Sequence, residues 1–296
     1  MNYEKFCSIM NEQIFREDKK KLLRIIASQE LYFGDFSLLN SQIFLGSCLQ
    51  HLLQSREIRF GDAMEELISE LLREWGFRVL PKIILPDAAN KRKRLEIDQY
   101  FTKSEGGEVF YFIEQKVRDD HDSTKKKGQL NNFEAKLEFL YKKHGERLEG
   151  IMYFVDPDLS KNRNFYAEEL KKMEETYGLK LEILYGKELF EYFGRGELWE
   201  AILEWLGEWK EGLPELPEIN FDTSPRESFE EIKDLEVRYW RRILGNERLW
   251  EGGIMKAIFR EGETLRSLLE SFRLEEQDLA HERLAELLTQ RLKEFY

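Results

Sequence analysis

Several kinds of residue are scarce in this chain of 296 residues, and each shortage excludes a class of protein. The two cysteines, Cys7 and Cys48, match no metal-binding spacing, and the four histidines contain no His-x-x-x-His pair of the kind that binds zinc. No apolar run approaches the ~20 residues that a membrane-spanning helix needs, and the N-terminal residues lack the pattern of a secretory signal. We therefore expect a cytoplasmic protein with reduced thiols and no membrane partner.

Positive charge is also in short supply, since 46 lysines and arginines face 58 acidic residues and give a formal net charge of −12. A protein that coats nucleic acid nonspecifically gains affinity by neutralising phosphates, so this balance argues against that class. It does not exclude a nuclease, because a metal-dependent active site is itself acidic. Two basic clusters, residues 91–94 and 125–127, are each either a phosphate-binding surface or a solvated charge run. The chain lacks the G-x-x-x-x-G-K-[ST] motif, so we expect no nucleotide cofactor.

The spacing of apolar residues predicts a chain in three parts, residues 1–58, 59–210 and 211–296. The first and third parts have the 3.6-residue period of amphipathic helices, and residues 212–225 hold three of the six prolines, as expected of a linker. Helices and strands alternate in the middle part. We expect helices at residues 61–75, 124–143 and 165–177, and strands at residues 78–85, 94–101, 109–116, 150–155 and 179–184. This order predicts an α/β fold with a mixed central sheet flanked by helices.

Two of the expected strands, residues 94–101 and 109–116, are interpreted as a hairpin because a short glycine-containing segment joins them. A loop centred on Gly106 places Asp98 directly opposite Glu114. Two facing carboxylates repel each other, and a divalent cation held between them removes that cost. The hairpin therefore predicts a metal site.

The same register places Glu96 opposite Lys116, and alternation along the strands would put both on the face of the acidic pair. A metal ion beside an ammonium group suits the hydrolysis of a phosphodiester. The alternative is a surface hairpin with an ordinary cross-strand salt bridge, which contributes less than ~1 kcal/mol. The apolar run at residues 109–113 argues against it, because charged groups at the end of so apolar a strand are costly without a function.

The order of these residues resembles the motif of the PD-(D/E)xK nuclease superfamily. In that family an acidic residue ends one strand, and an acidic residue, any residue and a lysine lie on the next. The matching positions are Asp98 and then Glu114, Gln115 and Lys116, with Ile97 in place of the preferred proline. The resemblance implies a restriction-endonuclease-like fold and a nuclease activity.

Two further features strengthen the resemblance. Many members carry a glutamate on a preceding helix, and Glu65 occupies that position, with Glu66 as the neighbour that could be confused with it. Residues 114–129, taken as a block, look like the active-site segment of a group of type II restriction endonucleases. In related nucleases a glutamine early in the next helix lies near the metal or the phosphate, and Gln129 is the matching residue, unless it is simply a solvated helix position.

The resemblance implies a role for each of these residues in metal-assisted hydrolysis. Asp98, Glu114 and the backbone carbonyl of Gln115 would hold Mg²⁺, a hard cation that prefers oxygen ligands. Lys116 would orient or help deprotonate the attacking water and offset the charge of the phosphate. Glu65 would hold a second metal ion or a metal-bound water. The expected product carries a 5′-phosphate.

The segment that follows Lys116 is expected to contact DNA. Arg118, Lys125, Lys126 and Lys127 are candidate phosphate contacts, which position the duplex without reading its sequence. His121 lies in the same segment, but no HNH pattern accompanies it. We expect it to have a structural or DNA-contacting role rather than a catalytic one.

The leading interpretation is a Mg²⁺-dependent type II restriction endonuclease that cuts double-stranded DNA at short sites in a prokaryotic cytoplasm. Palindromic sites match a two-fold dimer, so a homodimer is expected. Arg238, Arg241 and Arg242 would supply dimer contacts or base readout, or else form the solvated edge of an amphipathic helix. The alternatives are a structure-specific repair or recombination nuclease of the same superfamily and a noncatalytic DNA-binding protein on the same fold.

Overall fold

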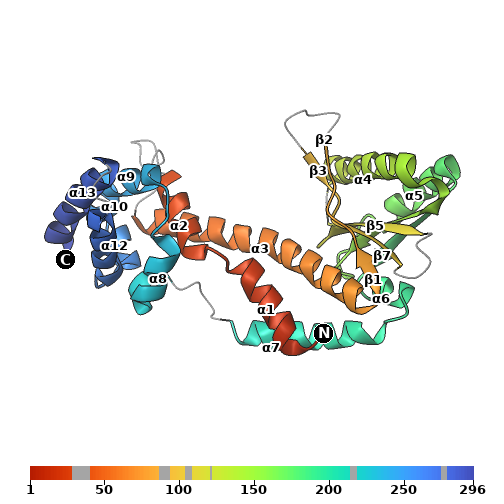
Figure 1. Ribbon diagram of the computed structural model, residues 1–296, viewed down its shortest axis with the longest axis horizontal. Helices are drawn as coiled ribbons and strands as arrows, with labels where there is room; N and C mark the ends of the chain where they lie inside the picture. The colour runs from red at the N-terminus through yellow and green to blue at the C-terminus, as the bar shows by residue number, and fades with distance from the viewer. Residues whose placement is uncertain (29–40, 87–93, 104–108, 121, 214–218, 275–278) are drawn as a thin grey trace. The chain divides into compact units, whose positions relative to one another are not determined.

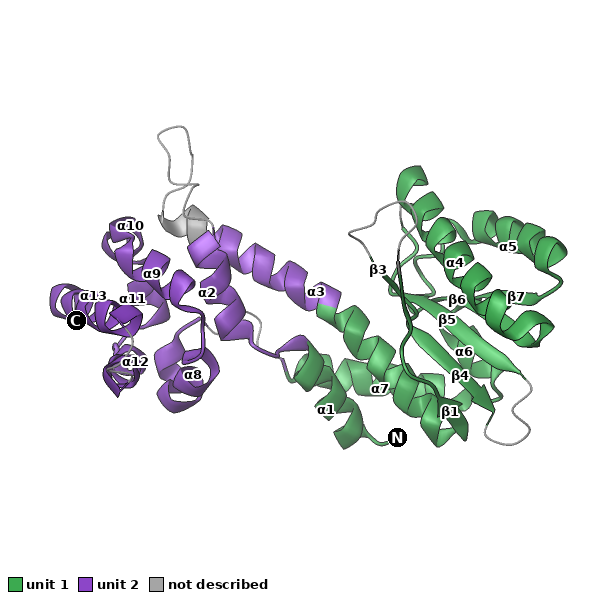
Figure 2. Ribbon diagram, turned by 45° about the horizontal axis from the view of Figure 1, so that its top comes forward, with its two compact units in different colours: residues 1–13, 59–212 green, residues 14–58, 213–296 purple. Residues whose placement is uncertain are grey.

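The computed structural model describes residues 1–28, 41–86, 94–103, 109–120, 122–213, 219–274 and 279–296. The chain forms two compact units, each built from two stretches of sequence (Figure 2). Unit 1 contains Met1–Gln13 and Arg59–Gly212, and unit 2 contains Ile14–Ile58 and Leu213–Tyr296. Within the described residues, no helix combines the length and the apolar character needed to cross a bilayer.

Unit 1 is built around a five-stranded sheet with the strand order β1-β4-β5-β6-β7. The strands are β1 (Phe77–Val79), β4 (Gln99–Lys103), β5 (Phe110–Lys116), β6 (Leu148–Phe154) and β7 (Lys180–Tyr185). β1, β4 and β5 pair antiparallel, whereas β5, β6 and β7 pair parallel, so the sheet is mixed. Parallel neighbours need a crossover connection, and α4 (Ser123–His144) and α5 (Arg163–Tyr177) provide one each.

Helices cover both faces of this sheet (Figure 1). On one face α4 and α5 pack their apolar sides on β5, β6 and β7, with Phe133 of α4 against Phe112 at a ring separation of 5.0 Å. The other face contacts the last part of α3 (Ser41–Glu74) and α6 (Lys187–Tyr192). Phe193, just after α6, packs edge-on against Phe101 of β4. The predicted α/β class, with a mixed sheet between helices, is confirmed.

The remaining elements of unit 1 are α1 (Tyr3–Ile14), α7 (Glu197–Glu211) and the short helix η2 (Gly145–Arg147), together with a separate two-stranded sheet formed by β2 (Ile84–Pro86) and β3 (Arg94–Glu96).

Three of the boundaries expected from the sequence are wrong. The single strand expected at residues 78–85 is divided between β1 and β2, which belong to different sheets. The strand expected at residues 94–101 is divided between β3 and β4. The helix expected at residues 61–75 is the last part of the 34-residue α3, which begins at Ser41.

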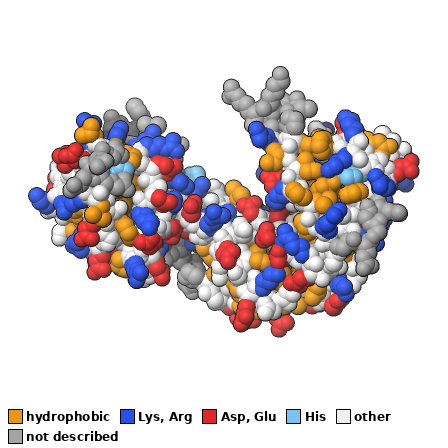
Figure 3. Space-filling model, in the orientation of Figure 1, with side chains coloured by type: hydrophobic (Ala, Val, Ile, Leu, Met, Phe, Trp, Pro, Cys, Tyr) orange, Lys and Arg blue, Asp and Glu red, His pale blue; other side chains and the backbone are white. Residues whose placement is uncertain are grey.

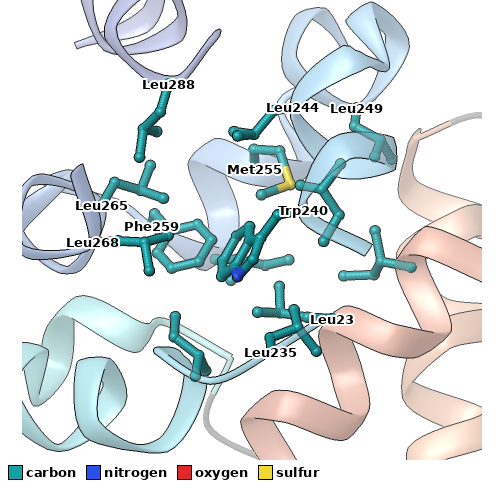
Figure 4. Close-up of a cluster of buried hydrophobic side chains, with 14 of the residues drawn as sticks. Leu23, Leu235, Trp240, Leu244, Leu249, Met255, Phe259, Leu265, Leu268 and Leu288 are labelled. Carbon is teal, nitrogen blue, oxygen red and sulfur yellow. The ribbon is translucent and has the colours of Figure 1, made fainter. Parts of the chain in front are cut away.

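Unit 2 is helical and surrounds one apolar core. Its helices are α2 (Asp18–Ser28), the first part of α3, η3 (Phe221–Thr223), α8 (Pro225–Ile232), α9 (Val237–Gly245), α10 (Glu247–Glu251), α11 (Ile254–Ile258), α12 (Glu263–Leu274) and α13 (Leu279–Phe295). α2 and α13 both pack on α9. Trp240 of α9 lies at the centre of the core, among Leu23, Leu235, Phe259 and Leu268 (Figure 4).

Gly150 is the position in the sheet where a side chain has no room. A Cβ atom added there would lie 2.7 Å from the Phe112 ring and 2.8 Å from Leu181 Cδ2. Phe112 and Leu181 lie opposite Gly150 on the two flanking strands, and both are buried. The side chains of β5 and β7 therefore fill the space above β6.

We expect Gly150→Ala to lower the free energy of unfolding of unit 1 by about 1–3 kcal/mol, because an overpacked core is strained. The matched control is Gly128→Ala in α4, where an added Cβ meets no atom within 4 Å. That control should raise stability by roughly 0.5–1 kcal/mol, since alanine favours a helix over glycine. Urea unfolding of both variants measures the difference, and equal stabilities would contradict the close packing around Gly150.

Candidate active site

The acidic pair predicted from the hairpin lies together in the structure. Gln99 at the start of β4 pairs with Ile113 of β5, so one step further along this antiparallel register Asp98 faces Glu114. The carboxylate Oδ2 of Asp98 accepts a hydrogen bond from the backbone N–H of Gln115 at 2.8 Å. This bond fixes the Asp98 side chain against β5, and both carboxylates are buried.

The expected position of Glu96 beside this pair is wrong. Glu96 belongs to β3, where it pairs with Ile84 of β2, and its carboxylate lies 2.9 Å from Lys82 Nζ. The strand is interrupted because Ile97 is fully buried and its N–H donates to the carbonyl of Ile83 rather than to β5. The alternation assumed for one continuous strand therefore ends at Ile97.

Lys116 contacts both acidic residues. Its Nζ lies 2.8 Å from Glu114 Oε1 and 3.2 Å from Asp98 Oδ2, and it donates to the backbone carbonyl of Gln115 at 2.7 Å. Burial disfavours the charged form of Lys116, but the two carboxylates outweigh burial and raise the pKa of this lysine. Lys116 is therefore a protonated hydrogen-bond donor in this arrangement.

A second lysine, which the sequence reasoning missed, completes the site. Lys136 reaches in from α4, and its Nζ contacts Glu114 Oε2 and lies 3.4 Å from Asp98 Oδ1. Its side chain is only 4% exposed. The signal in the sequence was its place in the apolar stripe of the helix, three residues after Phe133 and four before Leu140. We refer to Asp98, Glu114, Lys116 and Lys136 as the charge quartet.

Of the two candidate glutamates on α3, Glu65 is the one nearer the quartet. Its side chain is 24% exposed and lies 3.4 Å from Lys82 Nζ, whereas Glu66 is 45% exposed and pairs with Arg73. Burial, followed by the charge of Asp98, raises the pKa of Glu65 to about 7, although Lys82 and Lys116 act in the opposite direction. The Gln99 side chain also donates to the Glu65 carbonyl at 2.6 Å, which ties α3 to the start of β4.

A groove of about 400 Å³ opens beside Glu65 and Asp98. Its lining includes Asp62, Glu65, Glu66, Lys82 and Asp98. Asp98 therefore borders a groove at the surface of unit 1, whereas the Glu114 side chain lies deeper and is only 3% exposed.

The segment after β5 is anchored by a buried carboxylate that the sequence reasoning did not identify. Asp119 is fully buried and accepts hydrogen bonds from the backbone and the side chain of Asn162, each at 2.8 Å, and from the Tyr185 hydroxyl at 2.9 Å. These three donors satisfy the hydrogen-bonding needs of the buried carboxylate. They fix the chain between Lys116 and α4, where the expected DNA contacts lie.

Gln129 and the candidate DNA contacts occupy the first turns of α4 and the loop before it. The Oε1 of Gln129 accepts a hydrogen bond from the Tyr166 hydroxyl at 2.7 Å. Arg118, Lys125 and Lys127 are exposed. Lys126 instead lies over the Phe165 ring, with Nζ 4.3 Å from its centre.

Acidic and basic side chains are interspersed over the face of the molecule drawn in Figure 3, so the net negative charge is not gathered there into one surface. Residues 91–93, the hairpin loop at residues 104–107 and His121 lie outside the described residues.

The donor chemistry of the quartet fits a divalent metal. In the described part of the chain no three His, Cys, Asp and Glu side chains group together as a metal centre. Asp98 and Glu114, however, converge on the same two ammonium groups, so their oxygens already surround a cation. Two carboxylates and the nearby carbonyl of Gln115 form the oxygen donor set that Mg²⁺ prefers, with water completing its shell.

His144 lies at the end of α4, away from the quartet. Its Nε2 is 2.5 Å from the Tyr100 hydroxyl oxygen, and its ring stacks on Phe110 with centroids 3.7 Å apart. Burial, and then the nearby charges of Lys143 and Arg147, lower the pKa of His144. The folded state therefore resists the uptake of a proton by this imidazole.

We expect the stability of unit 1 to fall as the pH decreases below ~6.5, the usual pKa of histidine, because the unfolded chain then binds a proton that folded His144 does not. His144→Gln should reduce the difference in free energy of unfolding between about pH 5.5 and about pH 7.5. Urea unfolding at both values measures it. An unaltered dependence in His144→Gln would contradict this role.

The family model described as "Type II restriction endonuclease, HinfI" matches residues 76–210. A search of curated proteins finds no match. The matched residues include the whole charge quartet, whereas Glu65 lies before them.

Proposed function

Because residues 76–210 form a type II restriction endonuclease domain of the HinfI family, and the protein is thus a DNA-cleaving hydrolase, we propose that it cuts double-stranded DNA at a short specific sequence. We propose further that the reaction requires Mg²⁺ and leaves 5′-phosphate ends. The observation that carries the proposal is the convergence of Asp98 and Glu114, with Lys116 bonded to both, at the end of β5.

In this proposal Asp98, Glu114 and the Gln115 carbonyl would hold the metal ion. Bound there, Mg²⁺ would polarise the scissile phosphate and lower the pKa of a water molecule. In the structure the backbone N–H of Gln115 holds the Asp98 carboxylate in place. Lys116, whose side chain is 31% exposed, is the more exposed lysine of the quartet, and its ammonium would donate to the attacking water or to a phosphate oxygen.

The residues around the quartet take supporting roles. Glu65, whose pKa is near neutrality, would hold a second metal ion or a metal-bound water at the edge of the groove. Gln129, held by Tyr166, would contact the phosphate through the free end of its amide. Arg118, Lys125 and Lys127 would contact the DNA backbone. The partly buried Lys126 would contact it at the edge of the same surface.

We propose that residues 211–296 contribute to DNA recognition or to a homodimer. Arg238, Arg241 and Arg242 on α9 are exposed, whereas Trp240 between them is buried in the core of unit 2. A rigid helix that presents arginines to solvent suits contacts with guanine in the major groove. A two-fold dimer would match the symmetry of a palindromic site.

Cleavage of plasmid DNA tests the proposal. With Mg²⁺ the protein should produce discrete fragments whose ends map to one short sequence and ligate without added kinase, as 5′-phosphate ends do. Removal of the metal with EDTA should abolish cutting. Cutting confined to branched DNA would indicate a repair nuclease instead, and DNA binding without any cutting would indicate a noncatalytic protein.

A further inference from the structure

Lys136 holds a position in the quartet that the proposed reaction does not use. Each carboxylate gives one oxygen to each lysine: Asp98 Oδ2 and Glu114 Oε1 to Lys116, and Asp98 Oδ1 and Glu114 Oε2 to Lys136. The two negative and two positive charges balance. The acidic pair is thus neutralised entirely by side chains of unit 1.

The two lysines differ in how they are held. The Lys116 side chain is 31% exposed, on a strand that ends at the surface. The Lys136 side chain is 4% exposed, and it leaves α4 on the face that packs Phe133, Leu137 and Leu140 against the sheet. Lys116 can turn toward a substrate in solvent, whereas Lys136 is confined to the interior beside the carboxylates.

A divalent cation and the Lys136 ammonium make competing demands on the same oxygens. Both bind through Asp98 and Glu114, and two cations placed next to each other repel strongly where water is largely excluded. A metal ion can therefore take its place only if Lys136 gives up at least part of its contact with the pair.

We propose that Lys136 is a positioning residue that serves as the built-in counterion of the acidic pair in the metal-free enzyme and competes with the divalent cation for it. The inference rests on the proposed metal-dependent function. It has two consequences: unit 1 stays folded without metal because the buried carboxylates are paired, and metal affinity is weaker than the two carboxylates alone would give.

The test is Lys136→Met, which keeps the length of the side chain and removes its charge. In EDTA this variant should unfold at a lower temperature than wild type, because one buried negative charge is left unpaired. In calorimetric titrations of the full chain with Mg²⁺ alone, it should bind the metal roughly tenfold more tightly, a change within the usual range of coupling between two sites. Added Mg²⁺ should then raise its melting temperature more than that of wild type.

Lys142→Met is the matched control, since it makes the same chemical change at an exposed position of the same helix. It should leave both the metal-free melting temperature and the metal affinity unchanged. The inference is overturned if Lys136→Met binds Mg²⁺ with the same affinity as wild type or more weakly.

The outcomes also separate this inference from the proposed function. Metal binding by wild type with no gain in Lys136→Met removes the counterion role alone. If wild type binds no metal, both the metal-dependent function and the competition between Lys136 and the metal are ruled out.

If Lys136→Met does not fold in EDTA, the double variant Glu114→Gln with Lys136→Met decides, because it restores the charge balance. Recovered stability supports the pairing, and stability no better than that of Lys136→Met overturns it.

Discussion

Asp98→Asn is expected to lower the rate of DNA cleavage on the order of 10³-fold, since losing a metal ligand removes several kcal/mol of transition-state stabilisation. The amide keeps the size of the carboxylate and still accepts the hydrogen bond from the Gln115 N–H. Circular dichroism should therefore show a folded protein, and DNA binding should persist. Single-turnover cleavage of a plasmid measures the rate.

The control for this experiment is Glu96→Gln, which distinguishes two arrangements of the hairpin. If residues 94–101 were one continuous strand, Glu96 would lie beside Lys116 and its loss would impair cleavage. In the structure Glu96 belongs to the separate sheet of β2 and β3, so its replacement should change the rate less than about threefold, which corresponds to well under 1 kcal/mol. Near-normal cleavage by Asp98→Asn would instead remove Asp98 from the metal site.

Trp240→Ala is expected to lower the free energy of unfolding of unit 2 by about 3–5 kcal/mol, the cost of deleting a large buried aromatic side chain. Trp240 is fully buried, and its ring lies 6.1 Å from that of Phe272. Its indole N–H has no hydrogen-bond partner among the described residues, so truncation leaves no polar atom unpaired and the cost arises from the cavity.

Thermal unfolding followed by calorimetry measures this effect. If the two units unfold separately, as their division of the chain suggests, Trp240→Ala should lower one transition and leave the other in place. Arg241→Ala, on the exposed side of the same helix, should change stability by no more than about 0.5 kcal/mol. A loss from Arg241→Ala as large as that from Trp240→Ala would show that the core does not determine the stability of unit 2.

The arrangement of Asp98, Glu114 and Lys116 follows from local rules that act within one hairpin. The antiparallel register that pairs Gln99 with Ile113 puts Asp98 opposite Glu114, and the alternation of side chains fixes the face. Glu96 departs from the prediction because Ile83, more than ten residues earlier in the chain, accepts the N–H of Ile97 and draws this segment into another sheet. No pattern within the hairpin reveals that partner.

Lys136 shows a different limit of sequence reasoning. Its contact with Glu114 joins a helix to a strand 22 residues earlier, so only the packing of α4 on the sheet brings them together. A lysine within an apolar helical stripe was the available sign, since a buried ammonium needs an anionic partner.

The grouping of residues 14–58 with residues 213–296 in one unit could not be predicted from the sequence either. Helical periodicity predicts the helices but does not indicate which helices pack together.

The contacts among the four charges of the quartet also make its ion pairs less sensitive to added sodium chloride than exposed charges are. Dissolved ions screen charges over about 8 Å at physiological ionic strength, but they cannot enter between groups already in contact and largely enclosed. The exposed cations Lys125 and Lys127, which we propose contact the DNA backbone, have no such protection. Added salt should therefore release DNA, with a slope that counts the phosphates bound, while the acidic pair keeps its internal partners.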